Sequence, residues 1–242
     1  MDKIDYSKVL DTNSATYSAL ADRYADVERP DRVIEGWAGS ITEARGLAMF
    51  LGKNPQTAFE FGTGAGFNFS ALNEVCQSNG GFAVGVELAL GMHKITMDNN
   101  PDAYVFNADV KTTIQTFGRG EFDLIQSFST THCIPFEHAI ELYILFRERL
   151  KKDGRIILST PMHKEFKEGF FERDTPRPDK VPRLLRWKTD YNEPHIYKLA
   201  DESGLQIDTI ASRKDKLGRL NKMFVLENRP NKYTKGGLGI AG

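Results

Sequence analysis

Cysteines, long apolar runs and an excess of charge of either sign are scarce in this sequence. Only Cys76 and Cys133 occur among 242 residues. They form no metal-ligand spacing and suit a reducing compartment, with the cytoplasm expected by default. No apolar run approaches the about 20 residues that a membrane-spanning helix requires, and no apolar signal-peptide core follows Met1. The net charge of −1 argues against a large nucleic-acid-binding surface, although a local basic patch stays open.

The chain nevertheless has enough apolar sequence for an ordinary core. Hydrophobic residues make up 40% of it, which is sufficient for one sizeable α/β domain with additions. We expect residues 1–52 to form an N-terminal helical cap, residues 53–228 the main domain with an insertion at 160–192, and the glycine-rich residues 229–242 a flexible tail.

The most informative feature is an apolar run that ends in an acid and three alternating glycines. Glu60 precedes Gly62, Gly64 and Gly66, and a helical stretch follows. Glycine lacks a Cβ and accepts positive φ, so a ligand can approach the backbone, and free N–H groups at a helix start favour an anionic or polar ligand group. The pattern predicts a turn that binds a nucleotide-like cofactor. A plain turn is the alternative, because Gly-x-Gly alone is weak evidence.

A second apolar segment, residues 81–87, ends in the carboxylate of Glu87. In a nucleotide-binding βαβ unit, an acid at this spacing from the glycine turn accepts hydrogen bonds from ribose hydroxyls. The spacing therefore favours the cofactor site over the plain turn.

Strands and helices alternate through the rest of the chain. Such alternation implies a parallel sheet covered on both faces. The last two strands have a short connection without a clear helix, which predicts an antiparallel pair. We expect strands at residues 57–61, 82–86, 103–106, 122–127, 155–159, 205–212 and 223–227. We expect helices at about 67–76, 90–98, 136–150 and 195–203, a short helix after Val110, and a helix-ending turn at 151–154.

Two helices are expected before the first strand. The first begins at Ser14 as N-cap, after a loosely ordered polar segment 1–13, and the second runs from about Pro30 to near Gly52. Both are expected to flank or cover the cofactor pocket.

The insertion at residues 160–192 breaks this alternation with prolines and charges of both signs. It should lie beside the C-terminal ends of the strands, where open α/β sheets bind ligands. Three interpretations stay open: a lid for an anionic or sugar-like acceptor, a nucleic-acid contact, or a mixed-charge surface with its aromatic residues packed inward. Its cations and aromatics include Arg173, Arg177, Lys180, Arg183, Arg186, Lys188, Phe166, Phe170, Phe171 and Trp187.

Taken together, these motifs resemble those of the class I S-adenosylmethionine-dependent methyltransferases over about residues 57–228. The similar segments are the glycine turn, Glu87, residues 107–110 after the third strand, residues 122–127, and residues 150–158, in which Lys152 and Asp153 replace the family's Pro and Gly. The resemblance implies a doubly wound, mostly parallel seven-stranded sheet with a terminal antiparallel strand pair and an N-terminal helical cap, the Rossmann-like methyltransferase fold. It also implies S-adenosyl-L-methionine as cofactor and no metal.

The resemblance assigns the methionine end of the cofactor to the glycine turn. Gly62, Thr63, Gly64 and Gly66 would lie along it, and Glu60 would accept a hydrogen bond from its ammonium group, directly or through water. Glu60 has the alternative of stabilising a helix start.

The resemblance assigns the adenosine end of the cofactor to the next two loops. Glu87 would bind the ribose hydroxyls, with a surface acid as the alternative, and Leu88 would pack on the adenine, with ordinary core packing as the alternative. Asp109 would accept a hydrogen bond from the adenine amine, and its neighbours Ala108 and Val110 would line the site. Its alternative is a helix N-cap, and one residue can do both.

The acceptor side is assigned to the segment after the fourth strand. Ser127 would face the methionine moiety. His132 is the candidate general base, with a structural role as the alternative, since relatives mark the position of Cys133 more strongly as histidine. Tyr24 would close over the methionine end, with core packing as its alternative. Weaker acceptor-side candidates are His138, His163, His195, Asp190 and Tyr191.

The resemblance thus implies an enzyme that transfers a methyl group to an oxygen or nitrogen of a small molecule by in-line displacement. An RNA or protein methyltransferase of the same fold is the first alternative. A nicotinamide-dependent dehydrogenase and a non-catalytic S-adenosylmethionine-binding protein are the others. The sequence leaves the acceptor and the oligomeric state open.

Overall fold

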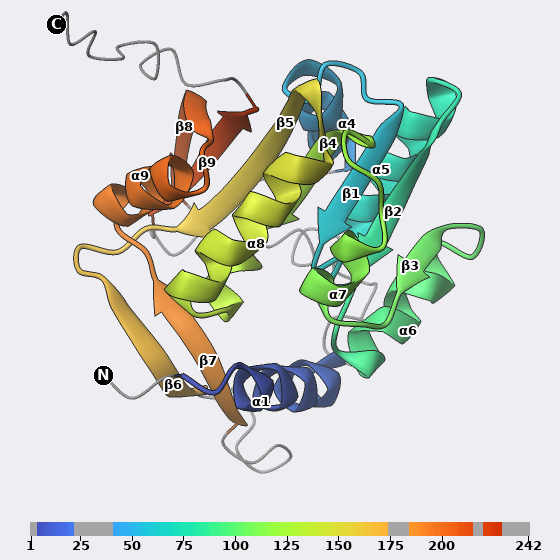
Figure 1. Cartoon of the computed structure of the whole chain (residues 1–242). Helices are drawn as coiled ribbons and strands as arrows, with labels where there is room; N and C mark the ends of the chain where they lie inside the picture. The colour runs from blue at the N-terminus through green and yellow to red at the C-terminus, as the bar shows by residue number, and fades with distance from the viewer. Residues whose placement is uncertain (1–3, 22–40, 174–183, 215–219, 229–242) are drawn as a thin grey trace, which may run out of the picture.

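The computed structural model describes residues 4–21, 41–173, 184–214 and 220–228. A seven-stranded sheet forms its centre (Figure 1). In sheet order the strands are β3 (Tyr104–Phe106), β2 (Phe82–Val86), β1 (Thr57–Phe61), β4 (Phe122–Phe128), β5 (Leu150–Pro161), β9 (Leu220–Glu227) and β8 (Gln206–Lys214). The first five run parallel, whereas β9 is antiparallel to both of its neighbours. The expected sheet with its terminal antiparallel pair is confirmed.

Helices cover both faces of this sheet, as a doubly wound fold requires. One apolar core joins the sheet to three helices, α7 (Val110–Gln115), α8 (Phe136–Arg149) and α9 (Glu193–Glu202). A second core joins the opposite face to α4 (Ile41–Phe50) and α5 (Phe67–Ser78). The remaining described α-helices are α6 (Leu90–Asn99) and α1 (Tyr6–Ala19), which contact each other.

The alternation of side chains along β1 separates the two cores. Phe59 is fully buried in the first core, where its ring lies 5.6 Å from that of Phe122 and 6.1 Å from that of Phe146. Ala58, one residue earlier, is buried in the second core. Because successive side chains point to opposite faces of a strand, a continuous apolar run is what a strand covered on both sides needs.

The first helix begins earlier than the sequence predicted. Asp5 is the N-cap of α1, and its carboxylate accepts hydrogen bonds from the backbone N–H groups of Ser7 and Lys8. The prediction of a loosely ordered segment capped at Ser14 is therefore wrong for the described residues from 4 onward. Ser14 lies within the helix, and its hydroxyl donates to the carbonyl of Leu88 at 3.3 Å. The second expected helix appears as α4, and its predicted part before residue 41 lies outside the described residues.

The expected turn at 151–154 belongs instead to β5. This strand starts at Leu150, directly after α8, and pairs Leu150 with Phe122 before an irregularity that pairs Arg155 with Leu124. Leu150 is buried in the first core, and Lys151 pairs with Asp123 at 2.9 Å. Burial of the leucine and this ion pair hold the segment against β4, so the predicted turn is wrong.

The insertion contains a two-stranded antiparallel sheet that the sequence did not predict. It consists of β6 (Lys167–Arg173) and β7 (Leu184–Asp190), and β7 lies beside α1 (Figure 1). Trp187 is buried, with the ring of Phe170 edge-on at 5.1 Å. The inward packing of aromatics that the sequence offered as one interpretation is therefore observed for Trp187.

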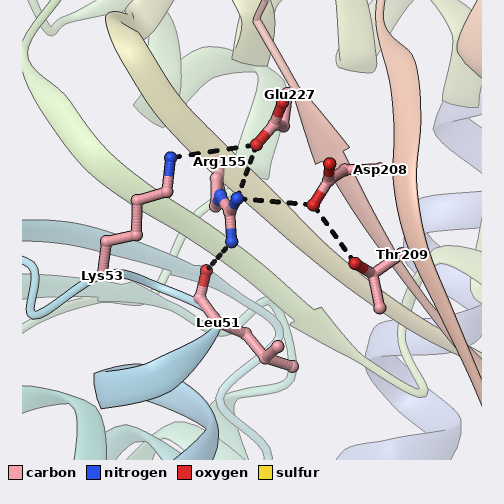
Figure 2. A network of polar contacts seen from close by, with 6 residues as sticks. All are labelled: Leu51, Lys53, Arg155, Asp208, Thr209 and Glu227. Carbon is pink, nitrogen blue, oxygen red and sulfur yellow. Dashed lines mark hydrogen bonds and ion pairs between the residues drawn. The ribbon is translucent and has the colours of Figure 1, made fainter.

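An ion network ties β5, β8 and β9 to the segment after α4 (Figure 2). The guanidinium of Arg155 donates to the carboxylate of Glu227 at 2.6 Å, to Asp208 at 3.3 Å and to the carbonyl of Leu51 at 3.0 Å. The Nζ atom of Lys53 lies 3.8 Å from the Glu227 carboxylate. Arg155 pairs with Leu124 near the start of β4, so the network braces the edge of the sheet opposite to the C-terminal ends of its parallel strands.

Candidate cofactor and acceptor site

The glycine turn at the end of β1 has the backbone that its sequence predicts. Gly62, Gly64 and Gly66 have φ values of +74°, +58° and +86°, a region that residues with a Cβ rarely adopt. A Cβ at Gly62 would also collide with the side chain of Thr130. No side chain caps the start of α5, so its first N–H groups stay available to a ligand.

Side chains from α6 and from its C-cap residue, Asn100, hold the carbonyl groups of this turn. Thr96 donates to the carbonyl of Gly64 at 2.6 Å, Asn99 to that of Ala65 at 2.8 Å and Asn100 to that of Gly66 at 3.3 Å. The turn is thus fixed before any ligand binds, which reduces the ordering cost of binding. No local pattern in the sequence predicts these bonds, because the partners are more than thirty residues apart.

Glu87 links the end of β2 to the glycine turn. Its carboxylate accepts hydrogen bonds from the backbone N–H of Gly64 and from that of Ala89, both at 2.9 Å. The side chain is buried, and burial raises the pKa of this carboxyl to about 7, although the backbone bonds oppose the shift. Each carboxylate oxygen accepts more than one hydrogen bond, so Glu87 retains capacity for ribose hydroxyls.

Glu60 is buried one strand away, at the end of β1. It accepts a hydrogen bond from Nε2 of Gln126 on β4 at 2.9 Å. Burial, reinforced by the nearby charge of Glu87, raises the pKa of Glu60 to about 8. The sheet order reverses between β1 and β4, and open α/β sheets bind ligands at such a switch point. Burial disfavours the ionised form of both carboxyls, and a positive charge beside them would favour it. This place therefore suits a cationic ligand group.

The loop after β3 is held against the loop after β2. Asn107 donates to the carbonyls of Glu87 and Leu88 at 2.9 and 3.0 Å. Asp109 caps α7, because its carboxylate accepts from the backbone N–H of Thr112 at 3.0 Å, and it also accepts from the hydroxyl of Tyr6 at 3.3 Å. The N-cap alternative for Asp109 is therefore observed, and its contact with adenine stays a prediction.

The remaining adenosine-side residues differ in burial. Val110 is buried in the first core, whereas Leu88 and Ala108 are partly exposed next to Glu87 and Asp109. The structure therefore gathers Leu88, Ala108 and the two acids at the C-terminal ends of β2 and β3. Tyr6 is a site neighbour that the sequence missed, since it was assigned to an unstructured segment.

Beyond β4, a short 3₁₀ helix, η1 (Thr131–Cys133), carries the candidate base. Ser127 is fully buried and hydrogen-bonded to Thr131 at 2.9 Å, and Thr131 to the hydroxyl of Tyr143 at 2.9 Å. The Ser127 side chain thus anchors η1 to α8, and its expected place beside the methionine moiety stays a prediction. His132 is buried on η1, and the neighbouring Thr130 donates to the carbonyl of Gly62 at 3.3 Å. The candidate base therefore adjoins the glycine turn.

The other acceptor-side candidates have varied surroundings. His138 stacks on Tyr6 with ring centroids 4.3 Å apart, and His195 stacks on Phe166 at 3.8 Å. His163 lies 3.2 Å from the Asp190 carboxylate. These contacts give the three histidines packing or pairing roles within the protein. The further candidates are Tyr191, which is fully buried, and Tyr24, which lies outside the described residues.

The segment after β4 is clamped between α1 and β7. Asn13 donates to the carbonyl of Cys133 at 2.6 Å, and its carbonyl oxygen accepts from the backbone N–H of Trp187 at 2.8 Å. Thr189 donates to the carbonyl of Ile134 at 2.8 Å. α1, the segment with η1, and β7 therefore form one wall. Sequence patterns could not reveal it, because a buried asparagine in a helix has no preferred distant partner.

A separate hollow lies far from these residues. Its volume is about 360 Å³, and it is lined by Arg45, Met49, Asn54, Glu74, Val75, Ser78 and Asn79. It lies against α4 and the end of α5, near the start of β1, and contains none of the predicted site residues. We therefore base the functional argument on the glycine turn and the buried acids. Among the described residues, no helix combines the length and apolar character needed to cross a membrane.

Comparisons with known proteins show which fold the chain has. No protein-family model matches the chain, and no curated protein matches it in sequence. The 1,6-didemethyltoxoflavin-N1-methyltransferase of Burkholderia thailandensis, solved with 1,6-didemethyltoxoflavin and S-adenosylhomocysteine bound, matches with a TM-score of 0.68 at 12% identity, over 95% of this chain and 92% of that one. The CcbJ methyltransferase of Streptomyces caelestis matches with a TM-score of 0.62 at 14% identity, over 90% and 99%.

A third solved structure, a SAM-dependent methyltransferase from Leishmania major, matches with a TM-score of 0.61 at 17% identity, over 92% of this chain and 82% of that one. These likenesses agree with the observed strand order and the antiparallel β9. The chain has the Rossmann-like fold of the S-adenosylmethionine-dependent methyltransferases.

Proposed function

We propose that the chain is an S-adenosylmethionine-dependent methyltransferase that acts on an oxygen or nitrogen of a small molecule. The observation that carries this proposal is the pair of buried acids, Glu60 and Glu87, beside a pre-formed glycine turn in a methyltransferase fold. The ammonium and ribose hydroxyls of the cofactor match these acids in charge and hydrogen bonding. The antiparallel β9 supports this function over a nicotinamide-dependent dehydrogenase.

When bound, the cofactor supplies a methyl group that its sulfonium sulfur has already activated. The task of the chain is to hold both reactants in line and to keep water away. Glu60 and the glycine turn would fix the methionine end, and Glu87 the ribose. The wall formed by α1, η1 and β7, here called the acceptor wall, would then shape the side from which the acceptor approaches.

His132 is the proposed base for a hydroxyl acceptor. The cofactor, held by the glycine turn, Glu60 and Glu87, would supply the methyl group to an oxygen lone pair of the acceptor and would keep the electron pair of the carbon–sulfur bond on sulfur. The hydroxyl proton would pass to the imidazole of His132. An amine acceptor already offers a lone pair, so it needs less help from a base.

A small acceptor is favoured over RNA or protein. The toxoflavin methyltransferase from Burkholderia thailandensis was solved with a small molecule bound. In this chain, two cations, one on β7 and one on β9, are neutralised locally. Lys188 pairs with Asp190, and Lys222 with Glu193 at 2.7 Å. Such pairing weakens the positive field that nucleic-acid binding requires.

The direct test incubates the protein with methyl-labelled S-adenosylmethionine and a fractionated cell extract. We expect label in a low-molecular-weight product, together with thermal stabilisation by S-adenosylhomocysteine and none by NADH. Label in RNA or protein would refute the small-molecule assignment. Binding of S-adenosylhomocysteine without transfer to any fraction would favour a non-catalytic binding protein.

A further inference from the structure

The guanidinium of Arg186 on β7 has unusually few partners for its burial. The residue is partly buried, and among the described residues it makes one hydrogen bond, from Nη1 to the hydroxyl of Tyr17 at 3.1 Å. Its Nε atom is buried without a hydrogen-bond partner. No carboxylate in the described ranges lies within ion-pair distance of it. A positive charge removed from water without a counter-charge is costly.

Tyr17 does not neutralise this charge. Burial raises the pKa of its phenol far above the usual value, so the hydroxyl remains neutral at physiological pH, even though Arg186 acts in the opposite direction. The hydroxyl oxygen also lies 3.3 Å from Sγ of Cys133 on η1. Arg186 is thus joined through one phenol to the residue that follows His132.

Two other cations of the same hairpin, unlike Arg186, have a carboxylate partner among the described residues. Lys188 pairs with Asp190, and Lys167 lies 3.2 Å from the Glu165 carboxylate. Along β7, Arg186 and Lys188 alternate with the buried Trp187 and Thr189. The side chains of both cations therefore point to the face of the strand opposite to Trp187 and Thr189. The described part of the hairpin therefore neutralises Lys188 locally and supplies no carboxylate to the guanidinium of Arg186.

We propose that Arg186 binds an oxyanion, a carboxylate or a phosphate, carried by the methyl acceptor. This inference rests on the proposed function and narrows its substrate class. A guanidinium presents its donors in a planar fork that matches such groups. The chain from Arg186 through Tyr17 to Cys133 places the anion site on the acceptor wall, beside the proposed base. Tyr17 is a positioning residue that orients the guanidinium.

The test is calorimetric titration of the full chain, saturated with S-adenosylhomocysteine, with benzoate, phenyl phosphate and neutral benzamide. Wild-type protein should bind at least one of the two anions more tightly than benzamide, and the two anion arms separate carboxylate from phosphate recognition. Arg186→Gln should weaken binding of the preferred anion about tenfold or more, whereas Arg186→Lys should retain part of it. Affinity for benzamide should stay unchanged in both variants.

Two further variants keep the test decisive. Arg119→Gln is the matched control, because the Arg119 side chain is 81% exposed outside the acceptor wall, and it should bind the anions as wild type does. If Arg186→Gln fails to fold, Tyr17→Phe removes only the hydroxyl that orients the guanidinium and should also weaken anion binding.

Three results would overturn the inference: no anion binding to wild type, equal affinities for the anions and benzamide, or full anion affinity in the Arg186→Gln protein. The saturation step separates this failure from failure of the proposed function. Absent binding of S-adenosylhomocysteine contradicts the function and, with it, the inference. Normal cofactor binding without anion preference contradicts the inference alone.

Discussion

Glu60 and Glu87 are carboxyls that the fold buries. Burial raises their pKa values to about 8 and about 7, from a usual 4.5. An acid whose pKa is raised by folding stabilises the folded state fully below its unfolded pKa. That contribution is lost as the pH rises through the folded pKa. Both groups therefore act against the cofactor-free fold at neutral and alkaline pH.

The free energy of unfolding of the cofactor-free protein should accordingly fall between about pH 5 and pH 8.5, at up to about 1.4 kcal/mol for each unit of pKa difference. Urea unfolding across this range measures it. The Glu60→Gln and Glu87→Gln proteins should show a flatter dependence. A wild-type stability that stays level or rises over this range would contradict the burial of these two acids.

His132 carries the second prediction at this scale. His132→Gln should lower turnover of a hydroxyl acceptor by about a hundredfold, since a positioned base contributes roughly that much or more, while affinity for S-adenosylhomocysteine stays normal. Steady-state kinetics with calorimetry separates the two effects. His93→Gln is the control, because His93 contacts the carbonyl of Val105 on the far side of β2. Unchanged turnover in the His132 variant would remove this residue from the mechanism.

At the scale of elements, Asn13 joins three segments of chain. It bonds Cys133 on η1 and Trp187 on β7 from its place in α1. Asn13→Ala should lower the free energy of unfolding by about 1–3 kcal/mol, because it leaves two backbone groups unsatisfied. It should also lower turnover more than cofactor affinity, since η1 loses its support. Chemical unfolding and kinetics measure these effects.

Asp11→Ala is the matched control for that experiment. Asp11 is exposed on the same helix, and substitutions at such positions change stability by about 0.5 kcal/mol or less. Equal effects of the two substitutions would show that the clamp does not contribute to the fold.

The central strands could be predicted from sequence, and the elements around the acceptor side could not. β1 and β2 have the expected bounds, because strands covered on both faces form apolar runs that glycines bound. The part of α1 before Ser14 was missed because it is polar and buries a polar residue, Asn13. The strands β6 and β7 were missed because charged residues interrupt their alternation. Their position depends on contacts with α1 that no local pattern encodes.

The candidate site divides in the same way. Glu60 and the glycines are neighbours in sequence, so their proximity followed from the motif. The bonds from Glu87 to Gly64 and from Arg186 to Tyr17 join residues 23 and 169 positions apart. Long-range partners of this kind depend on the packing of the whole fold. The sequence could therefore name the acids but not the groups that orient them.

At the scale of the whole molecule, the network around Arg155 holds the sheet edge opposite to the site (Figure 2). The side chains of Arg155 and Glu227 are 12% and 3% exposed. Arg155→Ala should lower the free energy of unfolding by about 3–5 kcal/mol, because it leaves a carboxylate buried with too little counter-charge. Affinity for S-adenosylhomocysteine should not change in the protein that remains folded.

The control for Arg155 is Arg213→Ala, which removes an ion pair to Glu43 whose partners are 45% and 41% exposed. Exposed pairs contribute about 1 kcal/mol or less. Urea unfolding of the two variants compares them directly. A loss below that of the Arg213 variant would show that the Arg155 network is dispensable.

Calorimetric titration with S-adenosylhomocysteine tests the central proposal, that the acids and the glycine turn form one cofactor pocket. Wild-type protein should bind one equivalent, and Glu87→Ala should lose about tenfold or more in affinity, because the proposed hydrogen-bond acceptor for the ribose hydroxyls is removed. NADH should produce no heat of binding. Absence of heat with S-adenosylhomocysteine, or wild-type affinity in the Glu87→Ala protein, would contradict the existence of that pocket.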